Sequence, residues 1–296
     1  MVRTEILVRQ GSDVVVDETT RERYQLASVS KQFTAAAVLL LAEQGVLGLD
    51  DPVGRWISGC PGEWRGITLR QLLRHTSGLG HWEDYPMIDL AEWVPPEELL
   101  TTFHAVPLKY SPGGGWSYSS PGYVLLAHVV EQAADTPYRK FLGDRIFGPL
   151  GLSRTFAGMP GDEPDVASGH DVAGQPVPSW ELDVVGMGAG DAWSTAEDVL
   201  TWLDSELFGR LCADPAPTGK GAEQSGYGYG VFTGETGGAG GRRWWHHSGD
   251  NAGFKAFAAV VPSIERRFVV LTNSDVLDMA TVRSIAERGD QAAELG

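Results

Sequence analysis

The stretch YQLASVSKQFTAAAVLLLAEQG, residues 24–45, begins with small and polar residues and then becomes almost wholly apolar. This pattern predicts a helix from about Ser28 to Gln44, with Gly45 as its C-terminal stop. A helix that is apolar on nearly every side is buried, so we expect this one to lie at the centre of the fold. The only lysine or arginine within the stretch is Lys31, three residues after Ser28.

Ser28 and Lys31 form a Ser-x-x-Lys pattern, and residues three apart share one face of a helix. A serine hydroxyl is a poor nucleophile until a base removes its proton, and a lysine amine can do so only when neutral. Burial lowers a lysine's pKa, and the positive end of the helix dipole acts in the same direction. That same helix end stabilises an oxyanion that forms near the serine. The alternative is that the tetrapeptide occurs by chance and Ser28 only caps the helix.

The remaining elements predict an α+β fold. Strand patterns cover 226–232, 242–249, 254–262 and 266–275, and residues 5–16 read as a hairpin. Helical patterns cover 68–78, 95–104, 121–134, 137–152, 194–209 and 278–295, residues 156–192 are expected to be irregular, and 236–241 is a predicted hairpin tip. Nothing alternates as βαβ, so we expect the hairpin to join the C-terminal strands in one antiparallel sheet flanked by helices.

This order of elements suggests two domains with the site in the cleft between them. Residues 1–60 and 195–296 would form a mixed α/β domain that carries the sheet, and 61–194 a mainly helical lobe.

The formal net charge of −16 argues against nucleic-acid binding, because such a surface repels phosphate. No histidine or cysteine spacing indicates a metal site, and we expect no cofactor. Cys60 and Cys212 are more simply two separate thiols than a disulfide. No segment resembles a signal peptide or is long enough to insert into a membrane, so a cytoplasmic protein is expected.

Two further motifs favour the catalytic interpretation of Ser-x-x-Lys over chance occurrence. Tyr118-Ser119-Ser120 lies in the loop SPGGGWSYSSPGY, and His247-Ser248-Gly249 lies on the strand pattern WWHHSGDNAGF. Together with ASVSKQFTA and ITLRQLLRHTSGL, these segments resemble the penicillin-recognising serine hydrolases. That family includes class C β-lactamases, D-alanyl-D-alanine carboxypeptidases, esterases and D-aminopeptidases. Its three motifs occur here in order, over most of the chain, which implies the β-lactamase/transpeptidase-like fold.

The resemblance also implies roles. Ser28 would be acylated, and Lys31 and Tyr118 would share the general-base and general-acid work, in an order that the residues leave open. Ser120 would bind the substrate or Lys31, and His247 would edge the cleft.

The backbone N–H groups of Ser28 and Asp250 would form the oxyanion hole, beside Ser248 and Gly249 of the third motif. His246 and His247 point to opposite faces of a strand, so only one can reach the cleft, and the register favours His247. Trp82 and Trp116 form either a wall that binds the substrate's acyl group or ordinary packing.

The function expected is hydrolysis of an ester or amide through an acyl-enzyme, with a carboxylesterase first. A D-amino-acid peptidase or carboxypeptidase, a weak β-lactamase and an acyltransferase remain alternatives, as does a non-catalytic binding protein of the same fold. Histidine replaces the usual lysine in the third motif, and it is charged only when protonated, which weakens the β-lactamase interpretation. The partner expected is a small ester, an amide or a short peptide.

Overall fold

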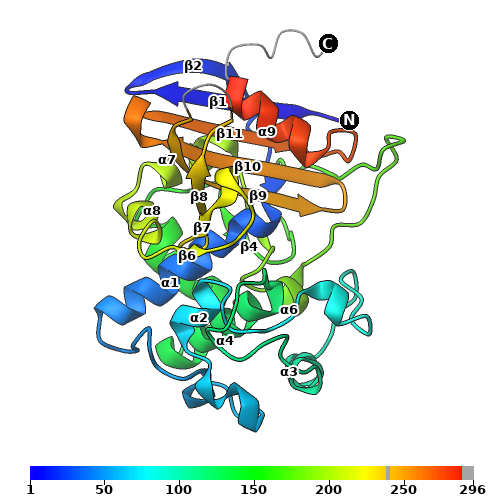
Figure 1. Cartoon of the computed structure of the whole chain (residues 1–296). Helices are drawn as coiled ribbons and strands as arrows, with labels where there is room; N and C mark the ends of the chain where they lie inside the picture. The colour runs from blue at the N-terminus through cyan, green and yellow to red at the C-terminus, as the bar shows by residue number, and fades with distance from the viewer. Residues whose placement is uncertain (238–240, 289–296) are drawn as a thin grey trace.

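An antiparallel sheet forms the upper half of the molecule (Figure 1). The computed structural model describes residues 1–237 and 241–288, and within them the sheet has the strand order β2-β1-β11-β10-β9-β8-β7-β6. The strands are β1 Thr4–Gln10, β2 Asp13–Glu18, β6 Ala216–Pro217, β7 Gly226–Tyr227, β8 Phe232–Glu235, β9 Arg243–Asn251, β10 Phe254–Val261 and β11 Arg266–Thr272. Hairpin β1–β2 joins the C-terminal strands through β11, where Ile6 faces Val270, so the prediction of one antiparallel sheet is confirmed.

Both faces of the sheet are covered. Alternate residues of β10 belong to different cores: Ala256 and Ala258 face the main core, and Phe257 and Ala259 face a smaller one. Helix α9, Met279–Arg288, covers the smaller core, which includes its Val282. A strand buried on both faces needs an almost continuous apolar sequence, which FKAFAAVV supplies.

The predicted central helix is confirmed, with a different first turn. Residues Ala27–Ser30 form a 3₁₀ turn, η1, and α1 follows over Lys31–Glu43. Gly45 has a φ of +70°, as the residue after a helix often does. Helix α1 packs on helix α4 of the lower half and lies beneath the sheet (Figure 1), and η1 packs on β9 and β10.

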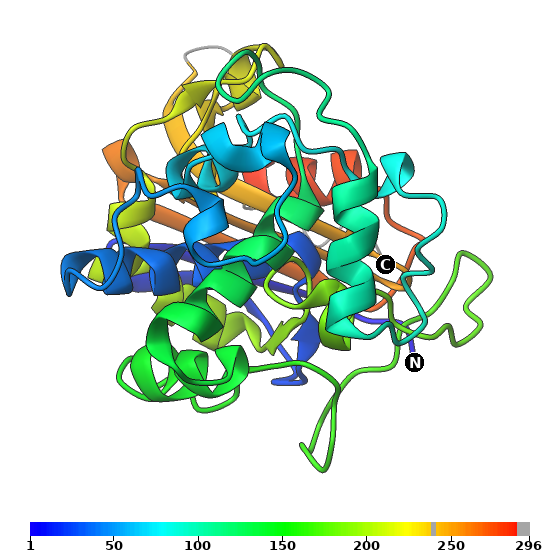
Figure 2. The same cartoon turned by 90° about the horizontal axis from the view of Figure 1, so that it is seen from below.

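Most of the other helices lie below the sheet and so in front of it in Figure 2, which is seen from below, whereas α7 packs on β1, β10 and β11. They are α2 Leu69–Leu73, α3 Pro96–Ala105, α4 Ser120–Ala134, α5 Tyr138–Leu142, α6 Asp183–Gly186, α7 Ala196–Leu203 and α8 Glu206–Leu211. The domain boundaries at 60/61 and 194/195 stay a prediction.

Several predicted boundaries are wrong for local reasons. The segment 194–209 is two helices, because Ser205 adopts an extended conformation and accepts a hydrogen bond from Phe208 N, which starts α8. Helix α2 ends at Leu73 rather than near residue 78, since His75 has a φ of +59°.

Two further segments differ from their predictions: one was predicted as a single strand and the other as irregular. Residues 226–232 form β7 and β8 around a turn at Gly230, whose φ is +78°. Within 156–192, Phe156–Ala157 is strand β4, and β5, Ala192–Ser194, joins β4 and β3, Tyr24–Gln25, in a small second sheet. The predicted tip at 236–241 includes residues 238–240, and the predicted C-terminal helix extends past 288; both parts lie outside the described residues.

Cys60 and Cys212 are both free thiols, as predicted. Among the described residues, no helix is both long and apolar enough to cross a membrane.

Candidate active site

Ser28 lies on η1, where the chain turns from β3 of the small second sheet into α1. The residue before it, Ala27, has a φ of +45°, a conformation that costs a non-glycine residue on the order of 1–3 kcal/mol and that is often found at functional sites. Gly249 of β9 packs directly on this turn, because a Cβ at Gly249 would lie 2.1 Å from the Leu26 carbonyl oxygen. The third motif and the serine turn are therefore in backbone contact.

Lys31, the first residue of α1, has no solvent exposure. Its Nζ lies 2.9 Å from Ser28 Oγ, 3.0 Å from Ser120 Oγ and 2.8 Å from the Ala189 carbonyl oxygen. Burial lowers the pKa of Lys31 to about 8, and the charge of Glu181 opposes this shift. The amine is thus neutral in an appreciable fraction of molecules near neutral pH.

Tyr118 comes from the loop before α4 and is enclosed by aromatic rings. The Tyr118 ring centroid lies 4.4 Å from that of His75 and 6.0 Å from that of His247, and Lys31 Nζ lies 5.0 Å from it. Burial raises the pKa of the phenol well above its ordinary value, although proximity to the Ser28 hydroxyl lowers it. Within the described residues the phenol oxygen makes no hydrogen bond of good geometry. It nevertheless lies close enough to Ser28 for that hydroxyl to affect its pKa.

His247 faces the same cluster and is neutral. It is 1% exposed, and burial, followed by the charge of Lys31, lowers its pKa to about 3. Its Nδ1 lies 2.7 Å from the Ser248 carbonyl oxygen, which can only accept, so Nδ1 carries the proton and Nε2 accepts from Tyr227 Oη at 3.0 Å. His246 instead stacks on Phe257 in the smaller core.

Two histidines hold the backbone of the second motif. His75 Nδ1 accepts from Ser119 N, and His81 Nδ1 accepts from Ser120 N, each at 3.2 Å. Burial lowers the pKa of His75 well below its ordinary value and that of His81 to about 3, so both imidazoles stay neutral and can accept. Sequence reasoning assigned neither residue a role, although both lie in HTSGLGH, residues 75–81, part of which carried the resemblance.

The end of β9 is held by a charge pair. Lys255 on β10 binds Asp250 at 2.8 Å and Asp275 at 2.5 Å. The Asp250 carboxylate is 58% exposed, so its side chain is occupied by Lys255 at the surface and its backbone remains the part relevant to the predicted oxyanion hole. Ser248 is half-buried beside it.

The two predicted tryptophans lie in different surroundings. Trp82 donates its indole N–H to Glu181, a residue that sequence reasoning missed. Trp116 packs on Tyr227 and Phe232, and the Lys220 ammonium lies 5.1 Å from its ring centroid.

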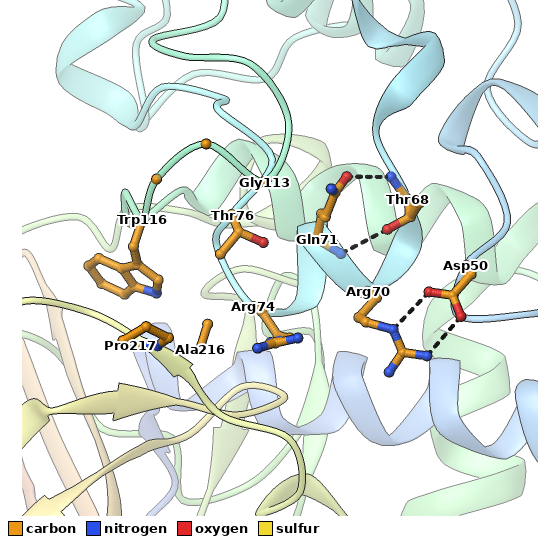
Figure 3. Close-up of a pocket in the computed structure, with 12 residues that line it drawn as sticks. Asp50, Thr68, Arg70, Gln71, Arg74, Thr76, Gly113, Trp116, Ala216 and Pro217 are labelled. Carbon is orange, nitrogen blue, oxygen red and sulfur yellow. Dashed lines mark hydrogen bonds and ion pairs between the residues drawn. The ribbon is translucent and has the colours of Figure 1, made fainter.

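Trp116 also borders an open cavity of about 510 Å³ (Figure 3). The far side of this cavity holds Arg70 and Arg74, which are ion-paired with Asp50 and Asp214. None of Ser28, Lys31 or Tyr118 lines it, so this cavity adjoins the candidate site without being part of it. Within the described residues, no group of three or more histidines, cysteines or carboxylates could hold a metal ion.

Comparison with known proteins identifies the family of the chain. The family model described as Beta-lactamase matches residues 6–291. The chain therefore belongs to the Beta-lactamase family, whose members are serine hydrolases with the β-lactamase fold, and its antiparallel sheet with flanking helices is that fold.

Individual relatives differ in how much they share with the chain. Penicillin-binding protein 4* of Bacillus subtilis is 38% identical over 51% of this chain and 37% of its own length, and esterase EstB of Burkholderia gladioli is 31% identical over 76% and 71%. A solved D-stereospecific amidohydrolase from Streptomyces sp. superposes with a TM-score of 0.81 at 25% identity, covering 96% of this chain and 93% of that one. The chain thus spans well under half of the first relative and most of the other two.

Proposed function

We propose that the protein is a carboxylesterase-like serine hydrolase that forms an acyl-enzyme on Ser28. The observation that carries this proposal is the 2.9 Å contact between Ser28 Oγ and the fully buried amine of Lys31. A binding protein of the same fold would have no need of a lysine held without solvent against a serine hydroxyl, since burying an amine is costly.

In the proposed acylation step, neutral Lys31 is the base. A neutral amine has two N–H donors and one lone pair: the donors serve the Ala189 carbonyl and Ser120 Oγ, and the lone pair accepts from the Ser28 hydroxyl. The proton moves to Nζ as Oγ attacks the substrate's carbonyl carbon. The backbone N–H groups of Ser28 and Asp250 would stabilise the oxyanion that results.

Tyr118 is then the acid. Its raised pKa keeps the phenol protonated at neutral pH, which suits a donor to the departing alcohol better than a base. The phenolate recovers its proton from the Lys31 ammonium. In deacylation, water takes the place of the alcohol and the same proton transfers run in reverse order. Ser28 then regains its proton and the carboxylic acid product is released. The proposal thus takes Lys31 as the first base, one of the two orders that the residues alone leave open.

The third motif supports an ester rather than a substrate with a terminal carboxylate. His247 has a pKa of about 3 and so offers no positive charge at neutral pH. The similarity to esterase EstB over 76% of the chain agrees with this choice. Amide hydrolysis is the second candidate, supported by the likeness to the Streptomyces D-stereospecific amidohydrolase.

A substrate panel tests the proposal: p-nitrophenyl acetate, D-alanine p-nitroanilide and nitrocefin, each with wild type and Ser28→Ala. We expect p-nitrophenyl acetate to have the highest kcat/KM and Ser28→Ala to lower it by ~10³-fold or more. Retention of wild-type turnover by Ser28→Ala would remove Ser28 as the nucleophile. No turnover of any compound, together with no labelling by a fluorophosphonate, would favour the binding protein.

A further inference from the structure

Glu181 is a buried carboxylate beside the candidate active site. It is 4% exposed, and its Oε1 accepts the indole N–H of Trp82. Its other oxygen lies against the backbone of Gly190, since a Cβ at residue 190 would be 2.1 Å from Oε2. Gly190 directly follows Ala189, whose carbonyl binds Lys31. The carboxylate therefore contacts the residue next to Ala189, whose carbonyl oxygen accepts a hydrogen bond from the Lys31 amine.

The second feature of this carboxylate is that it has no close cationic partner in the part of the chain that the structure describes. Among the described residues, no lysine, arginine or histidine lies within ion-pair distance of Glu181, and Oε2 accepts no hydrogen bond. The indole N–H satisfies only one of the two carboxylate oxygens, so Oε2 keeps its capacity to accept from a donor on a ligand. Lys31 does not pair with it either, because its three contacts go to Ser28, Ser120 and Ala189.

The backbone holds Glu181 in this position at a cost. Its φ is +49° and that of Asp183 is +55°, both in the left-handed region that non-glycine residues avoid. Such strain persists only where surrounding structure imposes it, and it is concentrated at functional sites. The strained turn places the carboxylate against Trp82 and Gly190.

The charge of Glu181 is felt by the reacting groups. Its charge raises the pKa of Lys31 against the larger lowering by burial, and after burial it adds to the raised pKa of Tyr118. The net charge of −16 also attracts cations to the protein as a whole.

We propose that Glu181 binds an ammonium group of the substrate, so that the preferred ester or amide carries a cationic amine close to its scissile bond. The substrate's ammonium supplies the counter-ion that Glu181 does not find among the described residues. Trp82 orients the carboxylate and adds an indole face for the cation. This inference rests on the proposed hydrolase activity of Ser28.

Two isosteric ester pairs test the proposal, one for each side of the scissile bond. Methyl 3-aminopropionate is compared with methyl butyrate, in which a methyl group replaces the ammonium. Acetylcholine is compared with 3,3-dimethylbutyl acetate, in which carbon replaces the charged nitrogen. The quantity measured is the ratio of kcat/KM, charged to neutral, within each pair. Any effect of a variant on Lys31 cancels in this ratio because it changes both esters alike.

The variants are Glu181→Gln, which keeps the shape and removes the charge, and Trp82→Phe, which keeps an aromatic ring and removes the N–H. Glu206→Gln is the matched control, because its side chain is 95% exposed on α8 and the variant changes the net charge equally.

We expect the wild type to prefer the charged member of at least one pair by about tenfold or more. For the primary ammonium this is the size of a hydrogen bond to a charged group, and for the quaternary ammonium, which has no N–H, it would come from charge attraction and the indole face. Glu181→Gln should remove that preference, Trp82→Phe should reduce it, and Glu206→Gln should leave it unchanged. A ratio that Glu181→Gln leaves unaltered in both pairs, or no preference in the wild type, would overturn the proposal while neutral-ester turnover still supports the hydrolase. No turnover of neutral or charged esters would instead overturn the proposed function itself.

Discussion

Raising the pH from 6 to 10 should increase kcat/KM for a neutral ester along a single ascending limb. The base is Lys31, whose burial lowers its pKa to about 8. Only the deprotonated amine can accept the Ser28 proton, so the rate follows the neutral fraction, which is about 0.01 at pH 6, about 0.1 at pH 7 and about 0.9 at pH 9. The rate should therefore rise ~10-fold from pH 7 to the plateau.

The neighbouring groups leave this limb undisturbed. His81 and His247 have pKa values of about 3, His75 is lowered well below its ordinary value, and Tyr118 stays protonated. The assay is initial-rate hydrolysis of a p-nitrophenyl ester in a constant-ionic-strength buffer series, with the chemical background subtracted.

Substitution of Glu181 tests the direction in which the midpoint of this pH profile moves. Its negative charge raises the pKa of Lys31, so Glu181→Gln should lower that pKa and move the midpoint of the limb to lower pH. Relative to its own plateau, the variant should then be more active than wild type at pH 7. A midpoint near 6.5, typical of a histidine, a flat profile, or a shift of the Glu181→Gln limb to higher pH would refute Lys31 as the base.

Tyr118→Phe should lower kcat by ~10²–10⁴-fold with little change in KM or thermal stability, because the phenol acts on the leaving group and makes no well-formed hydrogen bond within the described residues; an unchanged kcat would remove it as the acid. Gly249→Ala should destabilise by ~1–3 kcal/mol in urea unfolding and impair turnover, since its methyl group meets the Leu26 carbonyl. Gly209→Ala, where nothing lies within 4 Å, is its control, and equal stability of the two variants would contradict the contact. Thr68→Ala should cost about 1 kcal/mol of stability through loss of the capping box of α2, with activity retained, and no loss would show that this cap is dispensable.

Local chemistry made much of the fold predictable. The apolar run after Lys31 predicted a buried helix, and the alternating or continuous apolar runs near the C-terminus indicated strands. Predictions were wrong where one residue decides a boundary: Ser205 divides a helix, and the positive φ of His75 ends another. Neither decision has a periodicity that a sequence pattern can show.

The residues of the candidate site also include some that the sequence predicts and one that it does not. The three motifs pointed to Ser28, Lys31, Tyr118 and His247, and the structure brings these residues together. Glu181 could not be predicted, because its place depends on a strained turn and on contacts across a large sequence separation with Trp82. Isolated glutamates in a Gly- and Pro-rich segment carry no pattern that distinguishes a buried acid from a solvated one.

Mass spectrometry of the protein after reaction with a fluorophosphonate tests the central claim most directly. Digestion should yield one modified peptide, with the added mass on Ser28, and prior incubation with a substrate ester should slow its formation. Modification should be lost in Ser28→Ala and, near neutral pH, strongly slowed in Lys31→Met. A label on Ser120 or Ser248 instead, or an unmodified Ser28 in protein that still hydrolyses the ester, would contradict the account.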